Sequence, residues 1–386
     1  NLWPYNGSLN RGTTYEARFV PNNFNKFNSN NENIAFYIST EITPFQNVKA
    51  ILGFRGESFV QRYTGQSQTD NIVLDNEELI NDFDLFPTAN LIYSINEKQN
   101  LRVSYSQTIA RPSFKEMSYA EIYDPITGRT FVGGLFRDAD DVAGIVYWDG
   151  NLVVSKIQNA DLRWEMFQGR GQTISVSAFY KFFKNPIEIV QYLSIKNAFQ
   201  PRNVGNGQVA GLEFEMRQNL GLFSKKMENF VFSTNLTYTS SRIKQSETEL
   251  TSRNDNARNG EKVEEYREMA GQAPFIINAG LSFEGSDKGF LNGFEAGLFY
   301  NVQGPTLEVV GIADRPDVYT TSFNSLNLNI NKTFGESKKM QLGLKVENIL
   351  GDVKESVFQS FNATDQFYTY LNQGRTFQVR FGYKFF

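Results

Sequence analysis

The chain ends in FQVRFGYKFF (Phe377–Phe386), and this stretch decides its fold class. Apolar and aromatic residues alternate here with polar residues and glycine, as in a strand that has one apolar face. A long unpaired strand of this kind invites aggregation in a soluble protein, whereas the last strand of a transmembrane barrel pairs with the first and turns its apolar face to lipid. We therefore expect an all-β transmembrane barrel. The side chains expected to face the membrane are Phe377, Val379, Phe381, Tyr383 and Phe385.

Composition argues against a helical membrane protein and is compatible with a barrel. The 386 residues include 35 Phe and 18 Tyr, yet no stretch approaches the roughly 20 consecutive apolar residues that a membrane helix needs. A search for long apolar stretches does not detect barrel strands, because their lipid-facing residues alternate with polar residues of the interior. The net charge of −4 is too small to indicate binding of nucleic acid or of an acidic substrate.

The chain contains no histidine and no cysteine. Histidine is the commonest general base and transition-metal ligand, and cysteine supplies thiolate nucleophiles and zinc ligands. Carboxylates and lysines remain available, but no group of them forms a recognisable catalytic constellation. We therefore expect a protein that is not an enzyme, with no catalytic residue, no metal site and no cofactor.

Alternating segments recur along the whole chain, which is typical of a transmembrane barrel. They predict about 14 strands in an antiparallel, up-and-down order. The expected strands are Tyr15–Phe19, Ile34–Ile42, Val48–Phe59, Phe83–Ile95, Leu101–Ile109, Ala160–Phe167, Thr173–Val190, Phe199–Leu220, Phe230–Ile243, Phe275–Phe283, Phe294–Val302, Phe323–Phe334, Met340–Ile349 and Arg375–Phe386.

The connections between these strands alternate in length. The short ones are Pro44–Asn47, Asn96–Asn100, Gln168–Gly171, Gly221–Asn229, Gly285–Gly289 and Gly335–Lys339. The long ones are Gln61–Asp82, Ala110–Asn159, Lys244–Ala273, Gln303–Thr321 and Gly351–Gly374. Outer-membrane barrels have short periplasmic turns and long extracellular loops, whereas a β-sandwich has no reason to keep this order. We expect the short turns and Phe386 on the periplasmic side.

The strand SLNLNINKTF (Ser325–Phe334) illustrates the two faces. Leu326, Leu328 and Ile330 are expected to face lipid, while asparagines occupy the alternate positions. The asparagines expected in a wet interior are Asn327, Asn329 and Asn331. A half-exposed strand of a soluble sheet has the same period, so this strand alone does not identify a barrel.

Two long segments, Asn100–Met117 and Gln158–Val190, resemble TonB-dependent outer-membrane receptors, and within that family the branch common in Bacteroidota. The matching residues there are Tyr105, Ser106, Arg111, Pro112, Phe114, Asn159, Asp161, Leu162, Tyr180–Phe183 and Pro186–Ile189. Arg202–Met216 resembles the next strand of the family through Asn203, Gly205, Gly211 and Glu213. Lys345–Asp352 and the aromatic terminus resemble its last hairpin.

The resemblance implies a barrel of roughly 22 strands that is closed by an N-terminal plug. Residues 1–386 would then be one domain, the C-terminal portion of the barrel, with the plug absent from this chain. The function implied is active uptake of a nutrient (siderophore–iron, a vitamin, a peptide or a glycan) across the outer membrane of a Gram-negative bacterium. The implied partners are the lipid bilayer, the TonB complex through the plug, the nutrient and a surface lipoprotein, with no nucleic acid.

Two other functions remain open from the residues alone. A complete 14-stranded passive channel, like the long-chain fatty-acid channels, would need neither a plug nor TonB. A barrel hydrolase would need paired carboxylates or a lysine base, because histidine is absent.

The long connection Ala110–Asn159 contains aromatic and arginine side chains that are suited to hold a ligand by stacking and bidentate hydrogen bonds. The candidate ligand-binding residues are Tyr119, Tyr123, Arg129, Phe131, Arg137 and Trp148. The alternative is that these side chains pack the loop against its neighbours.

Four other motifs are better explained by structure than by a site. Asp138, Asp140 and Asp141 lack the ligand spacing of a calcium loop and indicate a solvated loop. Glu261–Glu268 predicts a charged helical turn or a flexible excursion without a site. Arg111–Pro112 predicts the end of a strand. The glycines of VGNGQVAG (Val204–Gly211) lack a following helix, so they indicate bulges or close approach of backbones rather than a phosphate site.

Overall fold

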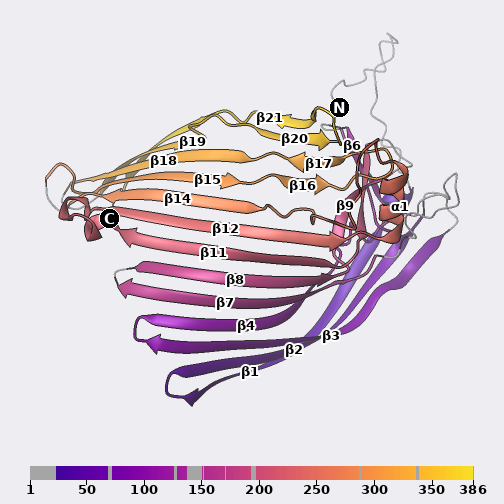
Figure 1. Cartoon of the computed structure of the whole chain (residues 1–386), viewed down its shortest axis with the longest axis horizontal. Helices are drawn as coiled ribbons and strands as arrows, with labels where there is room; N and C mark the ends of the chain where they lie inside the picture. Colours follow the sequence, from indigo (N-terminus) through magenta and orange to yellow (C-terminus); the bar gives the residue numbers. More distant parts are fainter. Residues whose placement is uncertain are drawn as a thin grey trace, which may run out of the picture.

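Consecutive strands of the chain pair antiparallel to form one long curved sheet (Figure 1). The computed structural model describes residues 23–67, 72–125, 128–136, 150, 152–169, 171–192, 197–286, 289–335 and 339–385. Thirteen strands follow one another across the sheet, and the short β13 (Tyr266–Arg267) pairs beside β12 as its fourteenth strand. The thirteen, in order, are β1 (Asn28–Phe45), β2 (Val48–Gln66), β3 (Val73–Asn96), β4 (Gln99–Ala110), β7 (Ser155–Gly169), β8 (Gln172–Lys184), β11 (Gly207–Asn219), β12 (Phe230–Lys244), β14 (Phe275–Glu284), β15 (Phe294–Gln303), β18 (Phe323–Phe334), β19 (Met340–Glu347) and β22 (Thr376–Tyr383).

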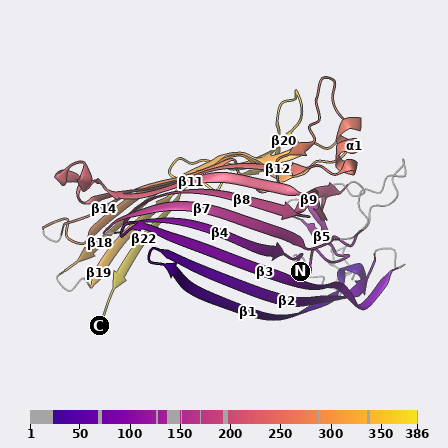
Figure 2. The same ribbon diagram turned by 60° about the horizontal axis from the view of Figure 1, so that its bottom comes forward.

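The sheet is curved about an axis parallel to its strands and so forms a trough, as the turned view shows (Figure 2). β1 and β22 lie at the two ends of the strand order, and within the described residues no pairing joins them. No helix in the described part of the chain has the length and apolar character needed to cross a bilayer.

The pairing register separates an apolar from a polar face. Phe381 lies opposite Leu342, and Val379 opposite Leu344, so the terminal strand continues the apolar face of β19. Leu344 in turn lies opposite Ile330 of β18. The alternate positions of β18 carry the asparagines, of which Asn329 and Asn331 line a groove on the other face. The expected separation of leucine and asparagine on β18 is confirmed, and contact of the terminal strand with lipid stays a prediction.

Thirteen of the expected strands, from Ile34 to Val302 and from Phe323 to the C-terminal strand, overlap strands of the sheet, while Tyr15–Phe19 lies outside the described residues. The expected strand Thr173–Val190 is in fact two strands, β8 and β9 (Ile187–Tyr192). Asn185 has a positive φ of 53°, and Pro186 has no N–H for the ladder, so the chain leaves the wall there.

Phe199–Leu220 is likewise two strands, β10 (Ala198–Asn203) and β11. Between them, Gly205 lies so close to the backbone of Lys244 that a Cβ at this position would overlap the Lys244 carbonyl oxygen. Close approach of backbones, rather than a phosphate site, therefore explains this glycine.

The long connections fold into two further four-stranded sheets at one end of the trough (Figure 1). One has the order β5 (Glu121–Asp124), β6 (Arg129–Val132), β10, β9; the other has the order β16 (Thr306–Val309), β17 (Asp317–Thr320), β20 (Lys354–Gln359), β21 (Gln366–Leu371). Together with helix α1 (Glu247–Asp255) and β13, we call these two sheets the loop layer. The opposite end, where the short connections lie, is the short-turn end.

Glu261–Glu268, expected to be a charged helical turn or a flexible excursion, contains no helical turn. The helix lies upstream, where the hydroxyl of Ser246 accepts a hydrogen bond from the backbone of Glu249 and so caps α1. Residues 261–265 are not helical, and Tyr266–Arg267 is the strand β13, paired with Ile243 and Lys244.

Candidate functional site

A cavity of about 550 Å³ lies in the loop layer, between the two small sheets. Its wall is mainly apolar and aromatic, with a few charged groups, which is the usual composition of a ligand pocket. The aromatic lining residues are Phe199, Phe358 and Tyr368, and the charged ones are Arg258, Asp314 and Arg315.

The three aromatic rings join the two small sheets. Tyr368 of β21 meets Phe199 of β10 with ring centroids 6.2 Å apart, and Phe358 of β20 at 5.0 Å, both nearly perpendicular. Edge-to-face pairs of this kind contribute roughly 0.5–1.5 kcal/mol beyond the area that they bury. The cavity wall is therefore held by contacts between segments that are far apart in the sequence.

Arg129 lies on the face of Tyr368, with its guanidinium carbon 3.9 Å from the ring centroid. Burial raises the pKa of Tyr368 to about 12, while Arg129 opposes this shift and Glu308 adds to it. The phenol is therefore neutral at physiological pH, and its buried oxygen has no hydrogen-bond partner among the described residues. Arg129 is also 3.8 Å from Glu308, which accepts hydrogen bonds from Thr320 and Ser356.

The charged rim of the cavity carries two guanidinium groups and one carboxylate. Arg315 donates to the backbone carbonyl of Tyr192 at 2.9 Å, and Arg258 to that of Phe361 at 3.4 Å. Because only Asp314 opposes them among the lining charges, the rim is net positive. An anionic ligand would complement this charge.

A chain of five ionic side chains fixes the elements around the cavity. Arg267 of β13 contacts Glu188 of β9 at 2.8 Å and Glu249 of α1 at 2.6 Å. Glu249 also lies 3.3 Å from Arg253. The guanidinium group of Arg253 in turn donates to both carboxylate oxygens of Asp317, at 2.8 and 3.1 Å.

This ionic chain is largely buried, the Arg267 side chain being 9% exposed. Burial opposes the charged form of Arg267, but Glu188 and Glu249 outweigh it and raise the pKa of this guanidinium. Removing one member of a buried pair costs about 3–5 kcal/mol, because it leaves the other charge uncompensated. Asp317 also accepts from the backbone of Gly311 at 2.7 Å, so the chain reaches the segment that carries Asp314 and Arg315.

The structure distributes the candidate residues of Ala110–Asn159 over different roles. Tyr119 is buried beside Tyr63, whose hydroxyl accepts from the Tyr119 backbone N–H at 3.3 Å. Tyr123 is exposed on β5 and does not line the cavity, and Phe131 contacts the ammonium group of Lys115. Arg129 reaches the cavity wall through Tyr368. Arg137 and Trp148, with Asp138, Asp140 and Asp141, lie outside the described residues.

Sequence reasoning missed the residues that line the cavity. The search for aromatic and arginine side chains was confined to one long connection, but Arg258, Arg315 and Tyr368 lie in three others. Applying the same criterion to every long connection would have found these three. Phe199 gave no such signal, because it was assigned to a wall strand.

Arg111 directly follows the last residue of β4, so the expected end of a strand is confirmed. Its guanidinium lies 2.9 Å from Glu57 and 4.2 Å from the centre of the Phe59 ring. These contacts give Arg111 a structural role on the inner face of β2.

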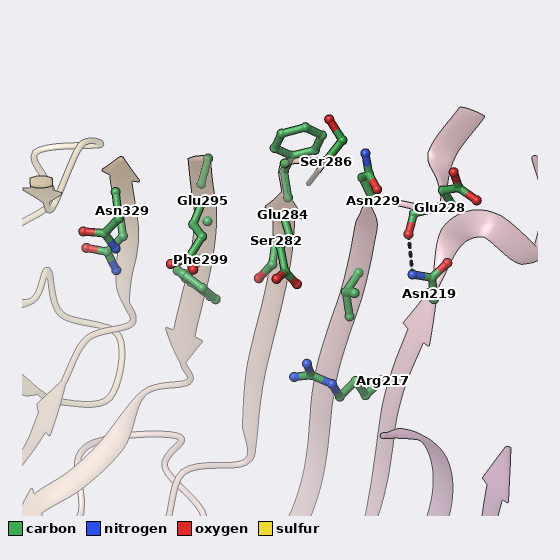
Figure 3. Close-up of a pocket in the computed structure, with 16 residues that line it drawn as sticks. Arg217, Asn219, Glu228, Asn229, Ser282, Glu284, Ser286, Glu295, Phe299 and Asn329 are labelled. Carbon is green, nitrogen blue, oxygen red and sulfur yellow. Dashed lines mark hydrogen bonds between the residues drawn. The ribbon is translucent and has the colours of Figure 1, made fainter. Parts of the chain in front are cut away.

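A second groove, of about 580 Å³, lies on the polar face at the short-turn end (Figure 3). It crosses β11, β12, β14, β15 and β18 and is lined by polar side chains, among them Arg217, Glu284, Glu295 and Asn329. Within the described ranges, no three His, Cys, Asp or Glu side chains lie close enough together to hold a metal ion.

Comparison with known proteins identifies relatives of most of the chain. Residues 2–349 match the family model described as "TonB dependent receptor-like, beta-barrel". No curated protein matches the sequence.

Among solved structures, the ferric citrate transporter FecA has a TM-score of 0.64 at 16% identity, covering 93% of this chain and 46% of that one. The siderophore receptor PiuA from Acinetobacter baumannii has a TM-score of 0.61 at 12% sequence identity, and the match covers 92% of this chain and 44% of the receptor. The copper transporter OprC has a TM-score of 0.61 at 14% sequence identity, and the match covers 92% of this chain and 48% of the transporter. The chain therefore spans a little under half the length of these solved structures.

Proposed function

Because the chain belongs to the TonB-dependent receptor-like β-barrel family, whose members lie in the Gram-negative outer membrane, we propose that it forms wall and outer loops of a receptor for active nutrient uptake. In this proposal the chain is the C-terminal portion of a larger barrel. The plug and the strands that complete the barrel lie outside the chain. Energy relayed through TonB would act on that plug.

The observation that carries the proposal is the cavity of the loop layer. It lies at the end that the loop lengths assign to the cell exterior, and its aromatic wall and positive rim suit an anionic ligand with an apolar part. The solved structures compared above are a ferric citrate transporter, a siderophore receptor and a copper transporter. Among the nutrient classes implied by the family, these neighbours and the positive rim favour an anionic metal chelate.

Uptake in cells tests this function. The full-length protein, produced in a strain without its own receptors, is expected to import a radiolabelled ferric chelate, ferric citrate being the first probe. Deletion of TonB should abolish import, whereas a passive channel would continue to conduct. A panel of vitamins, peptides and glycans follows if the chelates fail.

Two substitutions connect uptake with the cavity. Arg315→Ala and Tyr368→Ala each remove a lining side chain and are expected to weaken ligand binding at least about tenfold, as loss of a charge-assisted contact or of an aromatic wall does. Lys262→Gln is the matched control, because it removes a cation from the same end of the molecule that does not line the cavity. Unchanged affinity in both cavity variants would place the ligand elsewhere.

A further inference from the structure

Two neighbouring turns at the short-turn end expose large apolar side chains to their surroundings. The first turn, Leu220–Asn229, holds Leu222 and Phe223, which are 71% and 75% exposed. The second, residues 289–293, holds Phe290, which is 88% exposed. The backbone N–H of Glu284, at the end of β14, donates to the carbonyl of Asn229 at 3.0 Å, so the turns adjoin. We call these two segments the turn pair.

The first turn has a defined backbone conformation that is stabilised by hydrogen bonds. It consists of two short 3₁₀ helices, η2 (Leu220–Leu222) and η3 (Lys225–Met227). The side chain of Asn219 joins its two ends, because the amide oxygen accepts from the backbone of Gly221 at 2.8 Å and the amide nitrogen donates to the carbonyl of Glu228 at 2.6 Å. The second contact is drawn in Figure 3.

Gly221 is required for this closure, since a Cβ there would approach Asn219 and the backbone of Glu228 within about 3 Å. The fold therefore holds Leu222 and Phe223 outward instead of allowing them to collapse onto the turn. A turn that faced only water would gain nothing from such exposure.

The second turn is fixed by Lys332 of β18. Its ammonium group donates to the carbonyls of Phe290 and Asn292 at 2.5 and 2.7 Å, and lies 5.1 Å from the centre of the Phe290 ring. A lysine whose alkyl chain lies along an apolar surface while its ammonium group reaches polar groups is typical of a membrane–water boundary.

The strands directly beside the turn pair carry a row of aromatic rings on the apolar face. Phe230 and Phe283 have centroids 4.9 Å apart, and Phe283 and Phe294 are 6.1 Å apart. In transmembrane barrels such a band marks the level of the lipid headgroups. Lys332, which contacts the Phe290 ring, lies opposite Phe294 in the pairing of β18 with β15, so the second turn adjoins this band on the apolar face.

We propose that the turn pair is a membrane-interface anchor, in which Leu222, Phe223 and Phe290 enter the headgroup boundary of the adjoining phospholipid leaflet. Lys225 and Lys226, both exposed, follow Phe223 by two and three residues and would meet the lipid phosphates there. Continuity with the apolar face of the wall selects lipid as the occupant over a second protein. The proposal needs the sheet to lie in a membrane, but not that the loop cavity binds a ligand.

Depth-dependent fluorescence quenching tests this proposal, and because this chain contains no native cysteine, an introduced cysteine is the single labelling site within it. Phe223→Cys and Phe290→Cys variants of the full-length protein are labelled with an NBD fluorophore and placed in phosphatidylcholine–phosphatidylglycerol vesicles. The vesicles carry a doxyl quencher either near the headgroup or deep in the acyl chain. Asn329→Cys, on the polar face of the same end, is the matched control, and unmutated protein is the labelling blank.

Both turn probes are expected to be quenched about twofold more than the Asn329 probe, and more by the shallow than by the deep quencher, as for insertion of roughly 5–10 Å. Heat-modifiable migration of each variant shows that its barrel is folded. Two positions on separate turns keep the test informative if one substitution disturbs folding. Quenching of both turn probes no greater than that of the Asn329 probe overturns the proposal, and in that case a protein partner or water covers the turn pair.

Discussion

The wall and the loop layer of this protein are stabilised in opposite ways. In the wall each strand pairs with its neighbour and the apolar side chains point outward, so that Phe381 is 67% exposed. In the loop layer the large side chains are buried against one another, and ionic groups such as Arg267 and Glu188 are buried with them. The wall therefore leaves its apolar surface to be covered by its surroundings, whereas the loop layer has an interior of its own. Long loops of a barrel need not be loose.

The largest expected effect separates the two regions through the ionic chain. Arg267→Met leaves Glu188 buried without its ionic partner and Glu249 with Arg253 alone, and should destabilise the loop layer by about 3–5 kcal/mol. The wall should remain folded. Limited proteolysis should therefore cut the loops while heat-modifiable migration stays normal.

Lys244→Met is the matched control, because its ion pair with Glu265 is exposed and should contribute little. Equal protease sensitivity of the two variants would mean that the ionic chain does not hold the loop layer.

A charge on the apolar face should act on the wall alone. Phe381→Asp is expected to cost up to about 2 kcal/mol, less than the cost of Arg or Lys at the same depth, and to reduce assembly into vesicles. Gln378→Asp introduces the same charge on the polar face of β22 and should assemble normally. Equal yields of heat-modifiable protein from both variants would contradict the assignment of the terminal strand to lipid.

A smaller effect is expected where Arg129 lies on Tyr368. Arg129→Gln removes the cation from the ring and should lower the stability of the loop layer by about 0.5–2 kcal/mol. Differential scanning calorimetry should show this in the loop transition and not in the wall transition. Lys115→Gln, which removes a more exposed cation from the ring of Phe131, should shift the loop transition less.

The smallest effect at ordinary pH concerns Tyr368 itself. Its pKa is raised to about 12 in the folded state, mainly by burial, so the neutral phenol contributes stability fully below pH 10 and loses it as pH rises toward 12. The loop transition should therefore not change between neutral pH and pH 9 on account of this group. Above pH 10, the melting temperature of the Tyr368→Phe variant should fall less than that of the unmutated protein. An equal fall in both proteins would mean that other groups cause the loss of stability.

The wall could be predicted from the sequence because its determinants are local. Alternation of side chains and the lengths of connections placed the strands from Ile34 onward, and β18 was predicted with the bounds that the structure shows. The breaks at Pro186 and Gly205 were missed, since the alternation continues across them. At Gly205 the cause is the backbone of Lys244, which only the folded chain brings near.

The loop layer could not be predicted in the same way. Its strands are short, and its contacts join residues whose proximity no local pattern encodes, such as Phe199 with Tyr368. The sequence identified Arg129 as a candidate, but not the ring that it contacts. Glu261–Glu268 shows the same limit, because β13 forms there only through its pairing with β12.

The separation of contacts along the chain has a consequence for the order of folding. Neighbouring wall strands are joined over short intervals, as in the hydrogen bond between Asn301 and Asn278, 23 positions apart. The loop layer joins Gln191 to Pro316 over 125 positions and Arg315 to Tyr192 over 123. Contacts over long intervals form slowly, because the chain entropy of closing them is lost first. The wall is therefore expected to form hairpin by hairpin, and the cavity of the loop layer to be the last part of the molecule to form.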